Sequence, residues 1–249
     1  MADVFHDVDV TRPTTTAEAL RQIYSDIYRQ ACPPAVDAKQ KEPNSPLPLE
    51  SKSDAAVSIS YILSAYHRPD ELACVLYSLK LQTQSDFEVI VTDNSTDPGI
   101  AARNRSVIYD LQDARFHYYN PRTIDCYTSA EWAIPMARGE FLCFPSDDSY
   151  YMPLFGEVLL KAARNNNLDL AYCNMIIDPR YFGMYWMLDV VAQLNCIDKT
   201  GFILRKSKFT RFPGALSTRF VDTDGRLISE LVRQGIRHGK VKDILVVHN

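Results

Sequence analysis

Apolar and polar positions follow two different rhythms between residues 55 and 249. Short runs of β-branched and aromatic residues between turn formers are typical of buried strands. Between them, apolar residues recur at helical spacing, as Leu72, Val75 and Leu79 do. We expect strands at 57–65, 87–91, 116–119, 141–144, 168–173, 201–204 and 244–247. We expect helices at 70–79, 100–111, 153–164 and 224–233, the first of them capped by Asp70. A further helix starts at Thr128 or Ser129 and kinks or ends at Pro135. This alternation predicts an α/β fold with a mostly parallel central sheet and helices on both faces.

Residues 1–54 differ from the rest of the chain. Three threonines at 14–16 can cap a helix with an apolar stripe over 19–28, which ends at the prolines 33 and 34. The segment up to residue 54 is a Pro-rich linker. Because the stripe must be buried, we expect it to pack on the main domain or on a second copy, as in a homodimer. The expected domains are 1–54 and 55–249, the latter divided into 55–148 and 149–249.

Composition and charge narrow the function classes. The 249 residues are 46% hydrophobic, which is too apolar for a disordered chain, and the net charge of -4 does not favour nucleic acid as a partner. No window approaches the roughly 20 apolar residues of a transmembrane helix, and the first residues do not resemble a signal peptide. The six cysteines are scattered, as in reduced proteins. We expect a cytoplasmic protein and leave peripheral association with a membrane open.

Three polar clusters follow predicted strands, at 66–69, 93–97 and 146–148. Ligands of parallel sheets bind beyond the carboxyl ends of the strands, so these clusters are candidates for one site. The adjacent carboxylates Asp147 and Asp148 can hold a hard cation such as Mg or Mn, which in turn neutralises a diphosphate. With 9 glycines in the chain and no glycine-rich phosphate motif, a metal is the better route to a nucleoside diphosphate.

The residues at 57–97, the run Ala137-Arg138-Gly139-Glu140-Phe141 before the cluster at 146–148, and the helix near Asp224 resemble family 2 glycosyltransferases of the GT-A fold. The resemblance covers about residues 55–249. It implies a Rossmann-like sheet, a nucleotide-sugar donor and a carbohydrate or glycoconjugate acceptor.

The resemblance also implies roles for individual residues. Tyr66 would pack by the nucleobase and Asp93 would accept a hydrogen bond from it; a uracil N–H suits that carboxylate, which points to a UDP-sugar. Asp148 and His248 would bind Mn or Mg, and Asp224 would be the general base, with Asp222 as a rival. The remaining residues expected to bind the donor are Ser64, Arg68, Ser95 and Asp147.

One base and in-line attack imply inversion at the anomeric carbon. The sequence departs from the family pattern at five positions. Ser64 stands for Pro, His67 for Asn, Ser146 for the first acid of the metal motif and Thr223 for Glu, and Pro135 interrupts a helix that continues in the family. The loss of an acid at Ser146 weakens the expected metal site. A non-catalytic module that binds a sugar nucleotide or glycan is therefore the alternative, with a nucleotidyltransferase ranked below it. Aromatic residues at 181–186 and the segment 211–219 are the expected acceptor region.

Overall fold

The computed structural model describes residues 56–121, 125–177, 186–194, 196–213 and 223–248. The N-terminal helix and linker predicted for residues 1–54 lie outside these ranges. The helices are α2 (Pro69–Lys80), α3 (Pro98–Asp110), α4 (Cys126–Ala133), α5 (Phe155–Asn165) and α6 (Thr223–Arg233). The strands are β1 (Ile59–Ala65), β2 (Phe87–Asp93), β3 (Phe116–Tyr119), β4 (Phe141–Cys143), β5 (Ser149–Tyr151), β6 (Leu170–Ile177), β7 (Trp186–Leu188), β8 (Phe202–Arg205) and β9 (His238–His248).

One nine-stranded sheet, with the order β3-β2-β1-β4-β8-β6-β9-β5, forms the centre, and β7 pairs with β6. The first four strands of that order are parallel. All seven residues of β2 are buried, as expected for a parallel strand covered on both faces. The predicted α/β architecture is confirmed.

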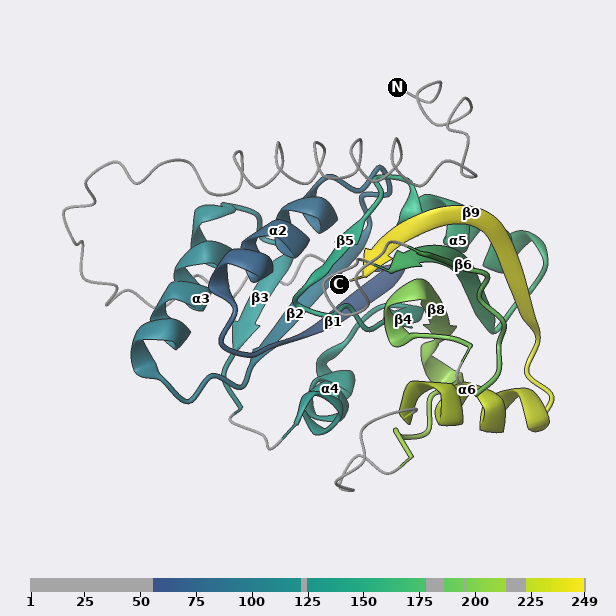
Figure 1. The fold of residues 1–249 in the computed structure, drawn as a ribbon. Helices are drawn as coiled ribbons and strands as arrows, with labels where there is room; N and C mark the ends of the chain where they lie inside the picture. The colour runs from purple at the N-terminus through teal and green to yellow at the C-terminus, as the bar shows by residue number, and fades with distance from the viewer. Residues whose placement is uncertain (1–55, 122–124, 178–185, 195, 214–222, 249) are drawn as a thin grey trace.

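The connections determine which face each helix covers. β1 leads through α2 to β2, and β2 through α3 to β3, on one side of β1, whereas α4 leads to β4 on the other side. Because such crossovers are right-handed, α2 and α3 must cover one face and α4 the opposite face. Figure 1 shows this arrangement, with α2 and α3 on one side of the parallel strands and α4 on the other.

The second half of the sheet mixes directions. β8 is antiparallel to both β4 and β6, while β9 is parallel to β6 and antiparallel to β5. As a result, the residues before β8 and the last residues of β9 reach the same edge as the carboxyl ends of β1 and β4. This antiparallel insertion is what brings the C-terminal half of the chain to the site.

The element boundaries differ from the predictions in explicable ways. α2 begins at Pro69, so Asp70 lies in its first turn and is not the cap. α4 begins at Cys126, because Asp125 accepts hydrogen bonds from the N–H groups of Tyr127 and Thr128. It ends at Ala133, just before Pro135, as predicted.

The three-residue strands β5 and β7 were not predicted, since so short a run shows no periodicity, and β9 is longer than the predicted 244–247. In the described ranges no helix combines the length and the apolar character needed to cross a bilayer.

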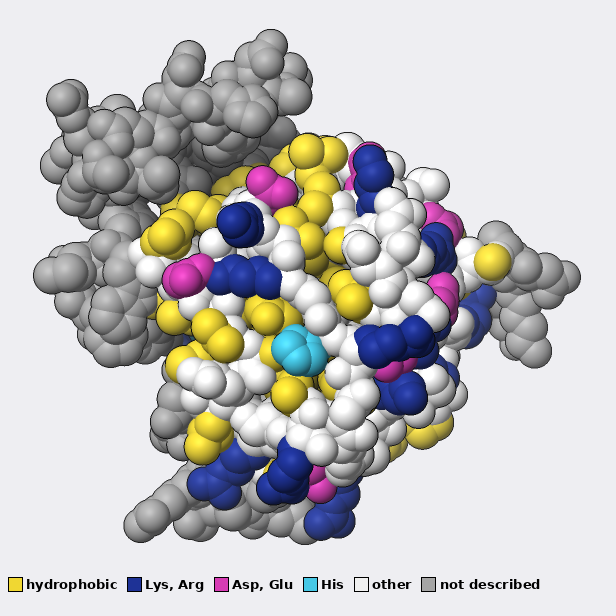
Figure 2. Space-filling view, turned by 90° about the vertical axis from the view of Figure 1, so that its right-hand side faces the viewer, with side chains coloured by type: hydrophobic (Ala, Val, Ile, Leu, Met, Phe, Trp, Pro, Cys, Tyr) yellow, Lys and Arg dark blue, Asp and Glu magenta, His cyan; other side chains and the backbone are white. Residues whose placement is uncertain are grey.

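Charged side chains are dispersed on the face shown in Figure 2. Lys and Arg side chains lie there in separate groups, among hydrophobic side chains and some Asp and Glu. Within the described residues of this face, they do not form the continuous basic stripe that is typical of nucleic-acid-binding proteins.

Candidate active site

The polar clusters predicted at the strand ends meet at the carboxyl edge of β1 and β4. The strand order reverses here, because β2 and β3 lie on one side of β1 and β4 lies on the other. Open α/β sheets bind ligands at such reversals. Ser64 and Ser146 form a backbone bridge, and the Tyr66 N–H donates to Asp147 Oδ2 at 2.9 Å. The loops after the two strands therefore form one continuous edge.

Arg68 connects the loop after β1 to the two adjacent carboxylates. Its guanidinium donates to Asp148 Oδ2 at 2.6 Å and lies 3.7 Å from Asp147 Oδ1. Both aspartates are buried. Burial raises the pKa of Asp147 to about 6, with a smaller contribution from the charge of Asp148, although the Tyr66 N–H, Arg68 and Lys199 oppose the change.

The loop after β2 supports the loop after β1. Ser95 Oγ accepts hydrogen bonds from the His67 N–H at 3.0 Å and from Asn104 Nδ2 at 3.2 Å. The Asp93 carboxylate is fully buried and accepts from the Ser95 N–H and the Tyr118 hydroxyl, both at 2.8 Å. In this conformation Asp93 holds the loop together and is not presented to solvent.

Two stacked rings lie beside this loop. Tyr66 is 56% exposed, and its ring stacks on His67 with centroids 4.2 Å apart and planes 14° from parallel. His67 has a φ of 55°, a left-handed conformation that His and Asn both tolerate, which explains how His67 stands where the family pattern has Asn. Ser64, near the end of β1, donates to the Cys126 carbonyl at 2.9 Å.

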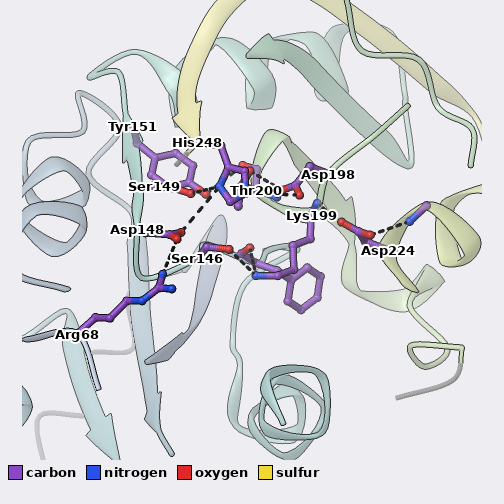
Figure 3. Close-up of polar contacts among 12 residues, drawn as sticks. Arg68, Ser146, Asp148, Ser149, Tyr151, Asp198, Lys199, Thr200, Asp224 and His248 are labelled. Carbon is purple, nitrogen blue, oxygen red and sulfur yellow. Dashed lines mark hydrogen bonds and ion pairs between the residues drawn. The ribbon is translucent and has the colours of Figure 1, made fainter. Parts of the chain in front are cut away.

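Lys199 joins this edge to the predicted base. Its ammonium donates to Ser146 Oγ at 3.0 Å, and its backbone N–H donates to Asp224 Oδ2 at 2.7 Å (Figure 3). Asp224 lies in the first turn of α6, where its Oδ1 also accepts the Gly225 N–H at 3.0 Å. Lys199 precedes β8, and the antiparallel pairing of β8 with β4 brings it beside Ser146.

The environment of Asp224 suits a general base. The side chain is buried, and burial raises its pKa to about 6, helped by the nearby charge of Asp198 and opposed by the two backbone N–H groups and Lys199. A carboxylate with a pKa near the working pH is a better proton acceptor than an ordinary aspartate.

His248, at the end of β9, lies near Asp148 and Asp198. Its Nδ1 is 2.9 Å from Ser149 Oγ and 3.9 Å from Asp148 Oδ1, and its Nε2 is 4.0 Å from Asp198 Oδ2 (Figure 3). No three His, Cys, Asp or Glu side chains in the described ranges are arranged as a metal site. Asp148 and His248 could supply two ligands, which suits a hard cation that takes its other ligands from phosphate and water.

The structure therefore brings together Ser64, Tyr66, Arg68, Asp147, Asp148, His248 and Asp224, with Asp93 and Ser95 in the adjoining loop. Sequence reasoning missed Lys199 and Asp198. The signal was the polar run 198–200 directly before the predicted strand at 201–204. This run can be assigned to the site only when that strand is known to run antiparallel to β4. Asp222 and most of the expected acceptor region lie outside the described residues.

Comparisons with known proteins identify the family of the chain. The profile of the family described as glycosyl transferase family 2 matches residues 60–224. The putative glycosyltransferase EpsH of Bacillus subtilis is 30% identical over 120 residues, which are 47% of this chain and 33% of that protein. An uncharacterized glycosyltransferase of Haemophilus influenzae is 28% identical over 123 residues, 47% of this chain and 40% of the relative. The matches thus span well under half the length of these curated relatives.

Solved structures share the fold. S. aureus TarS 1–349 superposes with a TM-score of 0.64 at 19% identity, over 78% of this chain and 60% of TarS. The mannosyltransferase PcManGT from Pyrobaculum calidifontis, in complex with GDP-Man and Mn2+, superposes with a TM-score of 0.63 at 15% identity, over 94% of this chain and 68% of PcManGT. The fold is the GT-A fold that the sequence predicted. Since the family profile covers more than half of its length, the chain belongs to glycosyl transferase family 2.

Proposed function

We propose that this protein transfers a sugar from a UDP-sugar to a hydroxyl group of a carbohydrate or glycoconjugate, with inversion at the anomeric carbon. One observation carries the proposal: the buried Asp224, whose pKa is raised, is hydrogen-bonded through Lys199 to the turn that holds Asp147 and Asp148. A base and an edge suited to a diphosphate therefore lie in one polar network.

The donor binds at the reversal of strand order. The exposed face of the Tyr66–His67 stack takes the nucleobase, since every base offers an aromatic face. Asp148 and His248 would hold a Mn or Mg ion, which supplies positive charge for the departing diphosphate. The relatives support this class of donor, because TarS has been solved with UDP-GlcNAc and PcManGT with GDP-Man and Mn2+.

Asp224 activates the acceptor. Its carboxylate takes the proton of the acceptor hydroxyl as that oxygen bonds to the anomeric carbon, while the bond from this carbon to the diphosphate oxygen breaks and UDP leaves. Attack from the face opposite the leaving group inverts the anomeric centre. Burial of Asp224 keeps bulk water from competing for this proton.

A donor screen tests the proposal. The protein is incubated with Mn2+ and UDP-, GDP- or dTDP-sugars, together with simple glycoside acceptors, and the product is examined by NMR. We expect transfer from a UDP-sugar and an anomeric coupling constant opposite to that of the donor. A product that retains the donor configuration would refute inversion, and preference for a GDP-sugar would refute the choice of UDP. Binding of nucleotide sugars without transfer would favour the non-catalytic alternative.

A further inference from the structure

Lys199 lies beside Ser146, the position at which the family pattern has the first acid of the metal motif. Its ammonium donates to Ser146 Oγ at 3.0 Å and makes a longer contact of 3.4 Å with the Phe144 carbonyl. Both acceptors are uncharged and belong to the segment that follows β4. An acid at position 146 could pair directly with this ammonium, whereas the serine offers it only a neutral hydroxyl.

Arg68 and Lys199, two cationic side chains of the site, have different partners. Arg68 is held by the Asp148 carboxylate at 2.6 Å. For Lys199, by contrast, the described residues provide no carboxylate oxygen within 4 Å of the ammonium. A partly buried ammonium whose direct acceptors are neutral oxygens gains more from a close anion than one already held in an ion pair, so Lys199 is the cation of the site that is available to a bound anion.

The surrounding carboxylates limit which anions can bind beside Lys199. The site contains Asp147, Asp148, Asp198 and Asp224, and an anionic ligand must overcome their repulsion. A ligand at the edge of β1 and β4 meets this ammonium beside Ser146.

We propose that the Lys199 ammonium binds the diphosphate of the donor and stabilises the negative charge that develops on it as the sugar departs. The inference rests on the proposed function and assigns to Lys199 part of the positive charge that a metal ion, held more weakly without an acid at position 146, would supply to the diphosphate. The same residue holds Asp224 through its backbone N–H, so it links leaving-group stabilisation to the placement of the base.

Binding measurements without catalysis test this inference. We compare Lys199→Met, which keeps the length of the side chain and removes its charge, with Lys199→Arg, which keeps the charge. Lys161→Met, at an exposed position of α5, is the matched control. Calorimetry gives the Kd of UDP and of uridine, each with EDTA and with Mn2+, and GDP and guanosine are used instead if the wild type binds GDP more tightly.

In EDTA, Lys199→Met should weaken UDP binding by about 10-fold or more, as expected for loss of a charge-assisted hydrogen bond, and should leave uridine binding unchanged. Lys199→Arg should retain most of the affinity, and Lys161→Met should behave as wild type. Thermal unfolding checks that each variant is folded.

Three results would overturn the inference. The first is an unchanged UDP affinity in Lys199→Met. The second is an equal loss of affinity for UDP and for uridine in that variant, which indicates a structural role. The third is a loss of UDP affinity in Lys199→Arg as large as that in Lys199→Met. If the wild type binds no nucleoside diphosphate, the proposed function fails and this inference fails with it. If the wild type binds UDP and Lys199→Met binds it equally well, only the inference fails.

Discussion

Replacing Asp224 with Asn should make the protein more stable and nearly inactive. The substitution keeps the shape of the side chain and removes its charge. As the proposed base, Asp224 contributes roughly 10²–10⁴-fold to the rate, so transfer should fall by that factor while the Kd of UDP stays nearly unchanged. The gain in stability follows from the raised pKa of the same buried carboxyl group.

The size of that gain can be worked out from the structure. Raising the pKa of Asp224 from 3.8 to about 6 corresponds to about 3 kcal/mol against folding at neutral pH, at 1.36 kcal/mol per pKa unit. Asn keeps one acceptor oxygen, so one of the two bonds from the Lys199 and Gly225 N–H groups is lost, at about 1 kcal/mol. The lost charge in the first turn of α6 costs about 0.3–1 kcal/mol more. The net stabilisation is about 1–2 kcal/mol.

The sign of the effect fixes its pH dependence. Because folding raises the pKa of Asp224, its ionisation opposes folding, and this opposition grows from about pH 4 and levels off above about pH 6. Urea unfolding should therefore show Asp224→Asn more stable than wild type at pH 7.5 and not at pH 4, where both are uncharged at this position. Asp243→Asn, at an exposed position of β9, is the control. Equal stability of Asp224→Asn and wild type at pH 7.5 would show that the carboxylate is not under strain.

Three further predictions concern catalysis, donor binding and packing. The kcat/KM of the wild type should be flat above about pH 6 and fall about tenfold per pH unit below it, because Asp224 must be ionised to accept a proton; a flat profile down to pH 5 in rate assays would contradict this. Tyr66→Ala should raise the Kd of UDP by roughly tenfold, through loss of stacking worth about 1–3 kcal/mol, measured by calorimetry, and should leave pyrophosphate binding unaffected. Gly139→Ala should lower the free energy of unfolding by about 1–3 kcal/mol in urea titrations, because the added Cβ would lie 2.7 Å from Ser60 Oγ; wild-type stability would mean that β1 shifts freely.

The first half of the fold could be predicted because its sequence pattern is local. β1 and β2 are seven-residue strands of mostly buried residues, polar residues follow β1 and end β2, and α2, with regular apolar spacing, separates them. Their parallel order places the ends of β1 and β4 together, so the convergence of Tyr66 with Asp147 follows from the pattern.

The rest of the site depends on pairings that the sequence does not reveal. Nothing in the residues around Lys199 indicates that β8 lies between β4 and β6 and runs against both. Likewise, His248 reaches Asp148 because β9 is inserted between β6 and β5, a choice made by packing and not by local propensity. Resemblance to a family identified His248 and Asp224, whereas Lys199 and Asp198 required the sheet order.

The position of β9 links donor binding to the local unfolding of this strand. β9 delivers His248 and is held by β6 on one side and only by the short β5 on the other. If β9 peels away transiently, the site loses His248, so a bound donor must raise the free energy of that opening. Amide protons of β9 would then exchange more slowly when nucleotide is bound, and residues of this strand far from His248 would report ligand occupancy without touching the ligand.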